Sequence, residues 1–344
     1  MGSYVLDWTY AEVLETFQEM GQPDYRADQL WKGIYHHLWL NPSEFTTFSK
    51  DLRQQLAANL DFTHLQAEKM LSSEDQSTEK ILYKLPDGKA IETVIMRYDD
   101  RNTVCISSQV GCGMGCDFCA TGTMGLIRNL SRGEIIEQVL RAQSRLAEDG
   151  LELSNVVFMG MGEPFNNYQE VMAAVETLND SEGFNFGIRR FTISTVGLVP
   201  GIKRFTKENS QINLAVSLHA ADNALRSSMM KINKKYPLEK LIPACREYTE
   251  TTGRRITFEW ALIHKVNDTE KQAKKLARLI GDMLAHVNVI PLNPNQHYPG
   301  EPSSNIRVRK FQNILQEHGI PCTIRIRRGI DIQAGCGQLA SEIN

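Results

Sequence analysis

From residue 103 onward, short runs rich in β-branched and aromatic residues alternate with amphipathic segments, and this alternation constrains the fold more than any other feature of the chain. We expect strands at residues 103–107, 155–159, 191–195, 212–217, 256–262, 287–292 and 322–327. We expect helices at residues 131–146, 168–178, 200–207, 238–251, 268–284 and 308–316. Strands that alternate with helices of this length form βα units around a parallel sheet. The sequence therefore predicts an α/β fold, a partial (βα)6 barrel of the TIM type, whose chemistry lies at the carboxyl ends of the strands.

The residues before the barrel follow a different pattern and are predicted to form two smaller units. Residues 10–20, 25–38 and 43–60 carry apolar residues at three- and four-residue spacing, which is typical of helices. Residues 80–85 and 90–98 alternate like strands on either side of a turn. We therefore expect a helical N-terminal domain at 1–75, a linking β-hairpin at 76–100 and a barrel with a C-terminal segment at 101–344.

The composition is that of a globular protein from a reducing compartment. The chain has 344 residues, 42% of them hydrophobic, and no apolar run approaches the length of a membrane helix. The N-terminus lacks the pattern of a signal peptide, so we expect a cytoplasmic protein with no membrane partner. Seven unevenly spaced cysteines suit metal or redox chemistry better than a disulfide scaffold. Because the net charge is −3, any nucleic-acid contact must come from local basic patches.

Three cysteines fall within eight residues in the segment from Gly111 to Gly122, which follows the first barrel strand. Thiolates are soft ligands that favour zinc, copper(I) or iron–sulfur clusters, and the CxxxCxxC spacing of Cys112, Cys116 and Cys119 lets one loop surround one metal centre. A cubane of four irons held by three cysteines leaves one iron free to bind a substrate or cofactor. A structural zinc site, which usually has a fourth ligand, and three coincidental core cysteines are the alternatives.

Polar residues follow several of the predicted strands and are expected to converge on one rim of the barrel. They include Glu163, Ser194, Ser217, His219 and Asn293. These groups suit a zwitterionic cofactor with ribose hydroxyls, which needs acceptors for its ammonium and donors for its carboxylate. Taken singly, each has a simpler interpretation, as a turn residue or a cap at a strand end.

Two further cysteines and one glutamate stand apart from these groups. Cys336 lies among glycines in an irregular segment, where a structural thiol is unexpected because unreactive cysteines are usually buried, and we predict a chemical role for it. Cys105 lies on an apolar strand and equally suits the core. Glu92 lies on the second strand of the hairpin, where a lone glutamate is usually solvated. Cys245 and Cys322 are predicted to be packing residues.

Several segments of the chain, taken together, resemble one known family. The cysteine loop alone resembles that of the radical S-adenosylmethionine (SAM) enzymes, whose CxxxCxxC loop holds a [4Fe–4S] cluster that chelates SAM through its open iron. The other segments are Cys105 with Ser107-Ser108-Gln109-Val110-Gly111-Cys112, Phe158-Met159-Gly160-Met161-Gly162-Glu163-Pro164, Ser217-Leu218-His219-Ala220, Ile232-Asn233-Lys234-Lys235-Tyr236, Val266-Asn267-Asp268 and Ala334-Gly335-Cys336-Gly337-Gln338-Leu339. The combination resembles the RlmN-type dual-specificity RNA (adenine-C2)-methyltransferases, from about Tyr25 to Leu339, and implies a radical SAM barrel.

The resemblance implies a role for each matching residue. Cys112, Cys116 and Cys119 match the cluster ligands. The positions that match SAM contacts are Gly162, Glu163, Ser194, Ser217, Leu218, His219 and Asn293. Cys336 matches the cysteine that carries the methyl group, Cys105 matches its partner thiol, and Glu92 matches a strand glutamate that acts as proton acceptor.

The activity that the resemblance implies is methylation of carbon 2 of adenosine 2503 in 23S ribosomal RNA and of adenosine 37 in transfer RNAs. Carbon 2 of adenine is electron-poor, so a radical must be brought to it. The implied scheme has Cys336 take a methyl group from one SAM, after which a 5′-deoxyadenosyl radical from a second SAM removes a hydrogen from that methyl group. The methylene radical adds to adenine, and product release leaves a transient Cys105–Cys336 disulfide. Both Cys105 and Glu92 are candidates for the base that removes the carbon-2 proton.

Contacts with RNA are expected at local basic patches. Residues 25–37 interleave basic and aromatic side chains, which can hold phosphates and stack on bases but also suit an amphipathic helix with solvated charges. The candidate contacts are Arg26, Lys32, Arg189, Arg190, Lys231, Lys234, Lys235, Arg254, Arg255, Arg325, Arg327 and Arg328. We expect the adenine to be presented from a loop or flipped out of its stack. The implied partners are 23S rRNA, tRNA and a reductant such as flavodoxin, and nothing in the sequence demands more than a monomer.

Two alternative functions stay open. The Cfr-type resistance methyltransferases use the same cysteines to methylate carbon 8 of the same adenosine, but Gly162-Glu163-Pro164 and the run at 299–304 look closer to the carbon-2 enzymes. The other alternative is a non-catalytic RNA-binding protein with a structural metal site. It predicts that Cys336→Ala has no effect.

Overall fold

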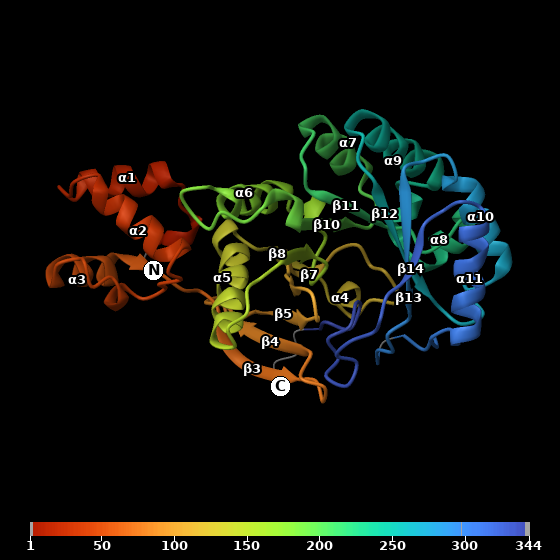
Figure 1. The fold of residues 1–344 in the computed structure, drawn as a ribbon, viewed down its shortest axis with the longest axis horizontal. Helices are drawn as coiled ribbons and strands as arrows, with labels where there is room; N and C mark the ends of the chain where they lie inside the picture. The colour runs from red at the N-terminus through yellow and green to blue at the C-terminus, as the bar shows by residue number, and fades with distance from the viewer. Residues whose placement is uncertain (1–2, 297, 341–344) are drawn as a thin grey trace.

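A single ten-stranded sheet runs through the computed structural model, which describes residues 3–296 and 298–340 (Figure 1). The strand order is β14-β13-β12-β11-β10-β9-β6-β5-β4-β3. Seven of these strands are parallel: β6 (Asn102–Cys105), β9 (Asn155–Phe158), β10 (Phe191–Thr195), β11 (Asn213–Ser217), β12 (Ile256–Leu262), β13 (Ala285–Pro291) and β14 (Cys322–Ile324). They match the seven predicted strands. Because β14 does not pair with β6 in the described part of the chain, the barrel is partial, as predicted.

Six helices follow the parallel strands and cover the outer face of the sheet (Figure 1). They are α5 (Arg132–Glu148), α6 (Tyr168–Asn179), α7 (Val199–Glu208), α9 (Leu238–Thr252), α10 (Glu270–Ile280) and α11 (Asn305–Glu317). Each lies where the sequence predicts a helix. In α10, residues at three- and four-residue spacing, such as Ala273, Leu276 and Ile280, are buried, which is the pattern of a helix with one face on a sheet.

The predicted hairpin is part of the main sheet rather than a linker, which corrects our expectation. Its strands β4 (Thr78–Lys84) and β5 (Ala90–Arg97) pair antiparallel, and β5 pairs with β6 on its other side. A further strand, β3 (Gln66–Ser72), pairs with β4 inside the region predicted to be helical. All of β5 except Arg97 is buried, because strands cover both its edges and the protein covers both its faces. β3 is an exposed edge strand, so its sequence lacks the alternation that signals a strand.

A two-stranded sheet that the sequence did not predict holds the cysteine loop. It consists of β7 (Gln109–Cys112) and β8 (Gly125–Asn129), which pair antiparallel. Short helices α4 (Ala120–Thr123) and α8 (Asn223–Met229) were also not predicted. Elements of four to seven residues give too little periodicity to be recognised in a sequence. Short 3-10 helices occur at Val5–Asp7, Pro42–Glu44, Pro164–Asn166, Ile188–Arg190 and Lys231–Lys234.

The N-terminal module contains α1 (Tyr10–Glu19), α2 (Tyr25–Tyr35) and α3 (Lys50–Asn59), and a short parallel pair of strands, β1 (Ser3–Tyr4) and β2 (Leu60–Asp61), joins its two ends. In Figure 1 it lies to one side of the sheet. The first two helices are present where predicted, whereas the third, predicted at 43–60, begins only at Lys50, after the 3-10 turn at Pro42–Glu44. Their apolar faces meet in a core of Val13, Phe17, Leu30, Trp31, Phe45, Phe48, Leu52 and Leu56.

Buried polar contacts fix this module to the barrel at α5. One carboxylate oxygen of Glu137, a fully buried side chain, accepts hydrogen bonds from the Tyr4 hydroxyl (2.5 Å) and the His64 backbone N–H (2.7 Å). The rings of Tyr4 and His64 stack with their centroids 3.6 Å apart. We refer to these three residues as the Glu137 junction. Opening the junction would remove these hydrogen bonds from a buried carboxylate, which would keep only the contact of its other oxygen with Arg141 (2.7 Å).

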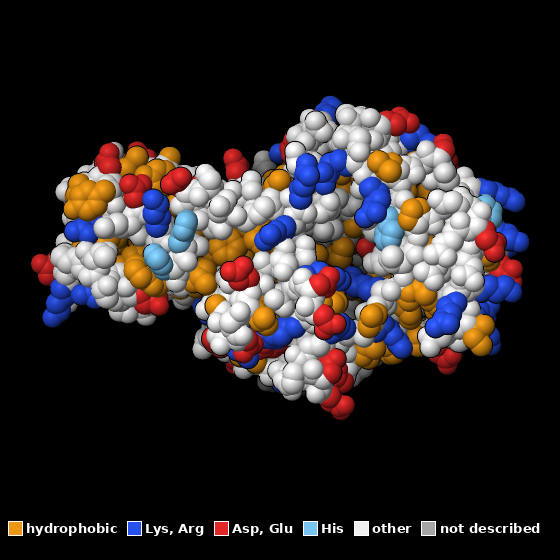
Figure 2. All heavy atoms as spheres, in the orientation of Figure 1, with side chains coloured by type: hydrophobic (Ala, Val, Ile, Leu, Met, Phe, Trp, Pro, Cys, Tyr) orange, Lys and Arg blue, Asp and Glu red, His pale blue; other side chains and the backbone are white. Residues whose placement is uncertain are grey.

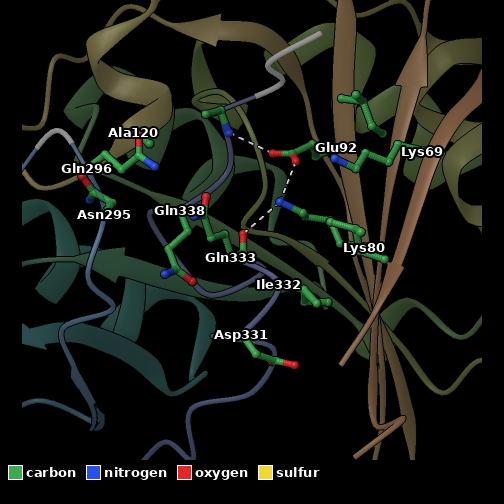
Figure 3. Close-up of a pocket in the computed structure, with 13 residues that line it drawn as sticks. Lys69, Lys80, Glu92, Ala120, Asn295, Gln296, Asp331, Ile332, Gln333 and Gln338 are labelled. Carbon is green, nitrogen blue, oxygen red and sulfur yellow. Dashed lines mark hydrogen bonds and ion pairs between the residues drawn. The ribbon is translucent and has the colours of Figure 1, made fainter. Parts of the chain in front are cut away.

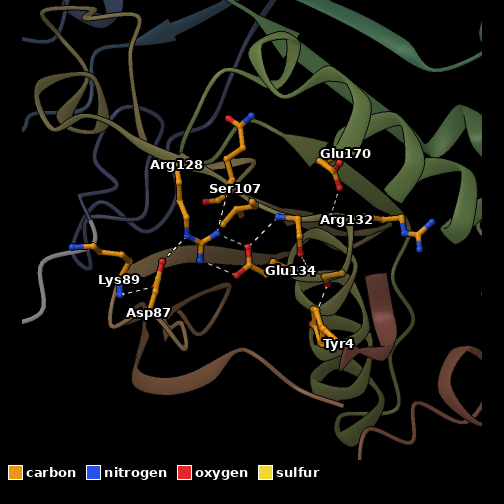
Figure 4. A network of polar contacts seen from close by, with 12 residues as sticks. Tyr4, Asp87, Lys89, Ser107, Arg128, Arg132, Glu134 and Glu170 are labelled. Carbon is orange, nitrogen blue, oxygen red and sulfur yellow. Dashed lines mark hydrogen bonds and ion pairs between the residues drawn. The ribbon is translucent and has the colours of Figure 1, made fainter. Parts of the chain in front are cut away.

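A second polar network joins the β4–β5 turn to the start of α5 (Figure 4). Arg128 on β8 pairs with Asp87 in the turn (2.6 Å) and with Glu134 in the first turn of α5 (2.7 Å). The antiparallel strands are therefore tied to the βα part by side chains as well as by the sheet. In residues 3–296 and 298–340, no helix has the length and apolar composition needed to cross a membrane.

Candidate active site

The loop that carries Cys112, Cys116 and Cys119 has its shape set by glycines. Gly111 has φ +72°, and a Cβ there would lie 2.0 Å from the Gly125 carbonyl oxygen, so a side chain does not fit between β7 and β8. A Cβ on Gly122 would lie 2.8 Å from the backbone oxygen of Cys116. The loop is also held from outside, because the Asp117 backbone N–H donates to the Met229 carbonyl (3.0 Å).

The three thiols are close enough to influence one another and are poorly solvated. Burial raises the pKa of Cys112 to about 12 and raises the pKa values of Cys116 and Cys119 as well, and the thiols of Cys112 and Cys119 add to the shift at Cys116. Iron would therefore have to displace protons when it binds. In the described part of the chain, no three His, Cys, Asp or Glu side chains are arranged to hold a single metal ion. As a donor set, three cysteines on one loop suit an iron–sulfur cluster with one open iron.

A cavity of ≈ 150 Å³ lies beside this loop at the carboxyl ends of β9 to β13; we call it the strand-end cavity. Nine of the residues that the sequence assigned to the cluster, the SAM contacts or the methyl carrier line it: Cys116, Cys119, Gly162, Glu163, Ser194, Ser217, His219, Asn293 and Cys336. Leu218 and Cys112 are not among the lining residues. Leu218 is buried and its carbonyl accepts a hydrogen bond from Arg226 (3.1 Å). The structure therefore brings most of the expected groups together at the predicted rim.

Glu163 is the buried acid of this cavity. Its two carboxylate oxygens accept hydrogen bonds from the backbone N–H groups of Phe165 (3.1 Å) and Val196 (2.8 Å). Burial raises the pKa of Glu163 to about 7, although these hydrogen bonds oppose the shift. Gly162 has φ +104°, and its Cβ would lie 2.6 Å from the Cβ of Gln109, so only glycine brings Glu163 into this position. The carboxylate is suited to accept an ammonium group.

His219 is a neutral donor in the same cavity. Its Nδ1 accepts a hydrogen bond from the Ala261 backbone N–H (2.9 Å), and burial lowers its pKa to about 3. The imidazole is therefore uncharged at neutral pH, with its proton on Nε2. The backbone of His219 is left-handed (φ +57°), and the Asn267 side chain holds it there by donating to the His219 carbonyl (2.8 Å).

The C-terminal segment brings Cys336 to the mouth of the cavity. The Asn293 side-chain N–H donates to the Cys336 carbonyl (3.1 Å), and the Ala120 backbone N–H donates to the Gly337 carbonyl (2.8 Å). A Cβ on Gly335 would lie 2.6 Å from Asn293 Nδ2, so glycine is required there. The Oδ1 atom of Asn293 is buried without a hydrogen-bond partner in the described part of the protein. It is an acceptor suited to a ligand hydroxyl or ammonium group.

Cys105 and Cys336 both line a smaller cavity, the thiol cavity, of ≈ 30 Å³. Cys336 lines both this cavity and the strand-end cavity. Both thiols are free, and burial raises the pKa of Cys105 to about 12, with the nearby Cys336 adding to the shift. Cys336 therefore lies between the loop of three cysteines and the second thiol.

Glu92 lines a third, polar cavity of ≈ 280 Å³, to which Asp331, Ile332 and Gln333 of the C-terminal segment also belong (Figure 3); we call it the Glu92 cavity. Its carboxylate pairs with Lys80 (2.9 Å) and accepts a hydrogen bond from the Ala340 backbone N–H (2.8 Å). Lys80 also donates to the Gln333 carbonyl (3.2 Å). Glu92 is buried, in contrast to the usual solvated glutamate, and the structure does not bring it into the strand-end cavity.

Two charged residues of the strand-end cavity were not expected there from the sequence. Glu259 lies on β12 and accepts a hydrogen bond from Asn288 (2.9 Å). The sequence could have indicated it, because a single acidic residue inside an apolar strand is unusual. Arg325 was expected among the RNA contacts, but it lines both the strand-end and the thiol cavity. It follows β14 in a run of basic residues, so its sequence context did not distinguish an inward arginine from surface ones.

These observations define a class of protein. The radical SAM superfamily model matches residues 106–277, and the chain resembles a crystal structure of a radical SAM methyltransferase from Sphaerobacter thermophilus with a TM-score of 0.97, at 48% identity over 99% of this chain and 100% of that one. The fold and the cysteine loop are thus those of a radical SAM enzyme, a class that uses a [4Fe–4S] cluster and SAM.

The N-terminal module narrows the class to a family. Residues 4–61 match the model of the ribosomal RNA large subunit methyltransferase N-terminal domain. The chain is 48% identical to the "Probable dual-specificity RNA methyltransferase RlmN" of Chloroflexus aurantiacus over 97% of this chain and 92% of that protein. It is 47% identical to the dual-specificity RNA methyltransferase RlmN 1 of Myxococcus xanthus, with 93% and 89% covered. The chain belongs to the RlmN family of SAM-dependent RNA methyltransferases.

Proposed function

We propose that this enzyme methylates carbon 2 of adenosine 2503 in 23S rRNA and of adenosine 37 in tRNAs, with Cys336 as the methyl carrier. The observation that carries the proposal is the position of Cys336, which lines the strand-end cavity on one side and the thiol cavity on the other. One thiol that borders both cavities can receive a methyl group where SAM binds and meet a second thiol afterwards. The dual-specificity names of the relatives support the pair of substrates.

Cys112, Cys116 and Cys119 are the proposed ligands of the cluster, and the strand-end cavity is the proposed SAM site. When bound, the reduced cluster supplies the electron that cleaves SAM. Glu163 would accept the SAM ammonium group, because its buried carboxylate has two backbone donors and, among the described residues, no cation paired with it. The Nε2–H of His219 and the free Oδ1 of Asn293 would hold the polar groups of the ligand. The backbone at Gly162 and the hydroxyls of Ser194 and Ser217 complete the proposed site. Leu218 lies outside the cavity lining and supports the site through its backbone hydrogen bonds with Glu259 (3.1 Å) and Arg226 (3.1 Å).

Cys336, Cys105 and Glu92 would carry out the remaining steps of the reaction. Cys336 as thiolate takes the methyl group from one SAM, which forms its S–C bond and breaks the bond from carbon to the SAM sulfur. After hydrogen abstraction, the carbon adds to adenine. Loss of the carbon-2 proton to a base, and of one electron that the oxidised cluster could take back, would restore the aromatic ring. The Cys105 thiolate would then attack the Cys336 sulfur and break its bond to the methylene carbon. That carbon would take a proton to become the methyl group of the released RNA, and a Cys105–Cys336 disulfide would remain. Glu92 is one candidate base and Cys105 the other.

The RNA would approach the side of the molecule where the cavities open. Figure 2 shows basic side chains around the recess at the centre of one face, next to the N-terminal module. We propose that this module docks RNA, with Arg26 and Lys32 among its contacts. We further propose that the enzyme acts as a cytoplasmic monomer with a reductant such as flavodoxin.

An anaerobic assay tests the proposal. The reconstituted protein is incubated with SAM, a reductant and unmodified rRNA fragment or tRNA, and the nucleosides are analysed by mass spectrometry. We expect 2-methyladenosine from both RNAs. Formation of 8-methyladenosine would assign the protein to the carbon-8 class, and SAM cleavage without any methylated nucleoside would reject both RNA assignments.

A further inference from the structure

Arg226 is a buried arginine that is bound to the carbonyl groups of two residues of the strand-end cavity, Val196 and Ser217. It lies on α8 and is 0% exposed. Its guanidinium donates hydrogen bonds to the carbonyls of Val196 (2.7 Å) and Leu218 (3.1 Å) and to Oδ1 of Asn233 (2.9 Å). All of these acceptors are neutral, so they satisfy the donors of the guanidinium but not its charge.

The charge of Arg226 has no carboxylate beside it. In the described part of the chain, no Asp or Glu side chain contributes to the pKa of this arginine. An unpaired charge is costly to bury. Burial lowers the pKa of Arg226 to about 10, so the guanidinium is protonated at neutral pH. The nearby thiols of Cys116 and Cys245 oppose this shift and raise the pKa of Arg226. Cys245 is a buried thiol whose pKa is raised to about 12 and is therefore neutral. Cys116 is a proposed cluster ligand.

The helix that carries Arg226 is joined directly to the cysteine loop. Cys116 forms an isolated antiparallel bridge with Met230, and the Asp117 backbone N–H donates to Met229. Met229 and Met230 follow Arg226 by about one helical turn. The position of the guanidinium relative to Cys116 is therefore set by backbone hydrogen bonds and by the strand-end carbonyls that it binds.

We propose that Arg226 raises the reduction potential of the cluster held by Cys112, Cys116 and Cys119. The cluster becomes more negative by one charge when it takes an electron from a one-electron donor. A fixed cation in a poorly solvated wall stabilises the reduced form more than the oxidised form, because charges interact strongly where water is excluded. Arg226 thus acts on the reaction through the cluster and not by contact with the RNA. The inference rests on the proposed cluster ligands but not on the proposed RNA substrate.

The test is a potentiometric titration of the cluster, followed by electron paramagnetic resonance, in wild type and Arg226→Gln without RNA. At the wild-type midpoint potential we expect the ratio of reduced to oxidised cluster to fall at least about tenfold, which for one electron is a shift of about 59 mV. Lys231→Met is the matched control. Lys231 is an exposed cation next to the cysteine loop: its Cδ lies 3.1 Å from the position that a Cβ on Gly115 would take. Because solvent screens its charge, its removal should change the ratio of reduced to oxidised cluster by no more than about twofold.

A second variant keeps the inference testable if Arg226→Gln fails to fold. Asn233→Asp places a carboxylate where an amide oxygen now lies 2.9 Å from the guanidinium and neutralises its charge, while the bonds to Val196 and Leu218 stay. We expect the same direction of shift. The inference is wrong if a folded variant of either kind, with wild-type iron content, has the wild-type midpoint. Iron analysis of the wild type comes first: a protein without four irons per chain would overturn the ligand assignment, and this inference with it.

Discussion

The strand-end cavity and the Glu92 cavity differ in how their walls are built. The ends of parallel strands and the loop between β7 and β8 form most of the walls of the first, and Cys336 and Gly337 of the C-terminal segment complete them. Most of its groups are therefore held by the sheet and by backbone hydrogen bonds. One wall of the second is the C-terminal segment, which contacts β4 and β5 through Lys80 and Glu92. The first is built to hold a small cofactor in one geometry. If Glu92 acts on RNA, as proposed, this segment would have to part from the sheet and break these polar contacts to admit the substrate.

The largest expected effect comes from Cys336, which lines the strand-end cavity and the thiol cavity. Cys336→Ala should lower the formation of methylated nucleoside by at least about 10³-fold, because the methyl carrier is lost. Binding of SAM, measured by calorimetry, should change little because the strand-end cavity is otherwise intact. Cys322→Ala, a buried cysteine of β14, is the control and should keep activity. Equal activity of the two variants would refute the carrier role.

Glu92→Gln should slow product formation without slowing the cleavage of SAM. If Glu92 is the base, product formation should fall by about 10²- to 10⁴-fold while SAM cleavage to 5′-deoxyadenosine continues. A protein–RNA crosslink that still holds the carbon-2 hydrogen should then accumulate and be visible on a denaturing gel. Wild-type turnover in this variant, with crosslink accumulation in Cys105→Ala, would assign the proton transfer to Cys105 instead.

The pH dependence of SAM affinity tests the strand-end cavity alone. Burial raises the pKa of Glu163 to about 7, so below pH 7 a proton competes with the SAM ammonium group for the carboxylate. Affinity should therefore fall about tenfold per pH unit as the pH drops below 7 and level off above it. Calorimetry between about pH 5.5 and 8 covers this range, and Glu163→Gln should bind weakly with a flat profile. A sloped profile in that variant would mean that another group titrates.

The smallest effect is expected far from both cavities, on α2. The double variant Arg26→Ala and Lys32→Ala should weaken RNA binding and lower the slope of log affinity against log salt by about one to two. Arg26 also donates to the Thr47 carbonyl (2.7 Å), so thermal stability should be checked alongside. Lys50→Ala, an exposed cation on α3, is the control on the same module. An unaltered slope would remove α2 from the RNA-binding surface.

The parts of the site that follow from local sequence were predictable. Parallel strands end at one rim, so Glu163, Ser217 and Asn293 could be expected together from their positions after predicted strands. The glycine-rich spacing of the three cysteines marked their loop equally well. Both signals are contained in short stretches of chain and need no knowledge of distant contacts.

The remainder depends on pairings between distant segments. The hairpin of β4 and β5 looked like a linker because its burial comes from β3, β6 and α5, none of which its own sequence reveals. Arg325 looked like a surface cation because nothing in its neighbourhood shows that it turns into a cavity. The separation of Glu92 from the strand-end cavity depends on the path of the C-terminal segment. That path is fixed in part by the hydrogen bond from Ala340 to Glu92, which joins residues 248 positions apart in the chain.

The Glu137 junction gives the enzyme a fixed length scale. Because Tyr4 and the chain at His64 are bound to a buried carboxylate of α5, the N-terminal module cannot slide or swing without breaking these buried hydrogen bonds. If RNA docks on the module, the distance between the docking helix and Cys336 is fixed. An adenosine would then be chosen by its distance from a folded RNA feature, so two RNAs of unrelated sequence can share one enzyme when they present an adenine at the same reach.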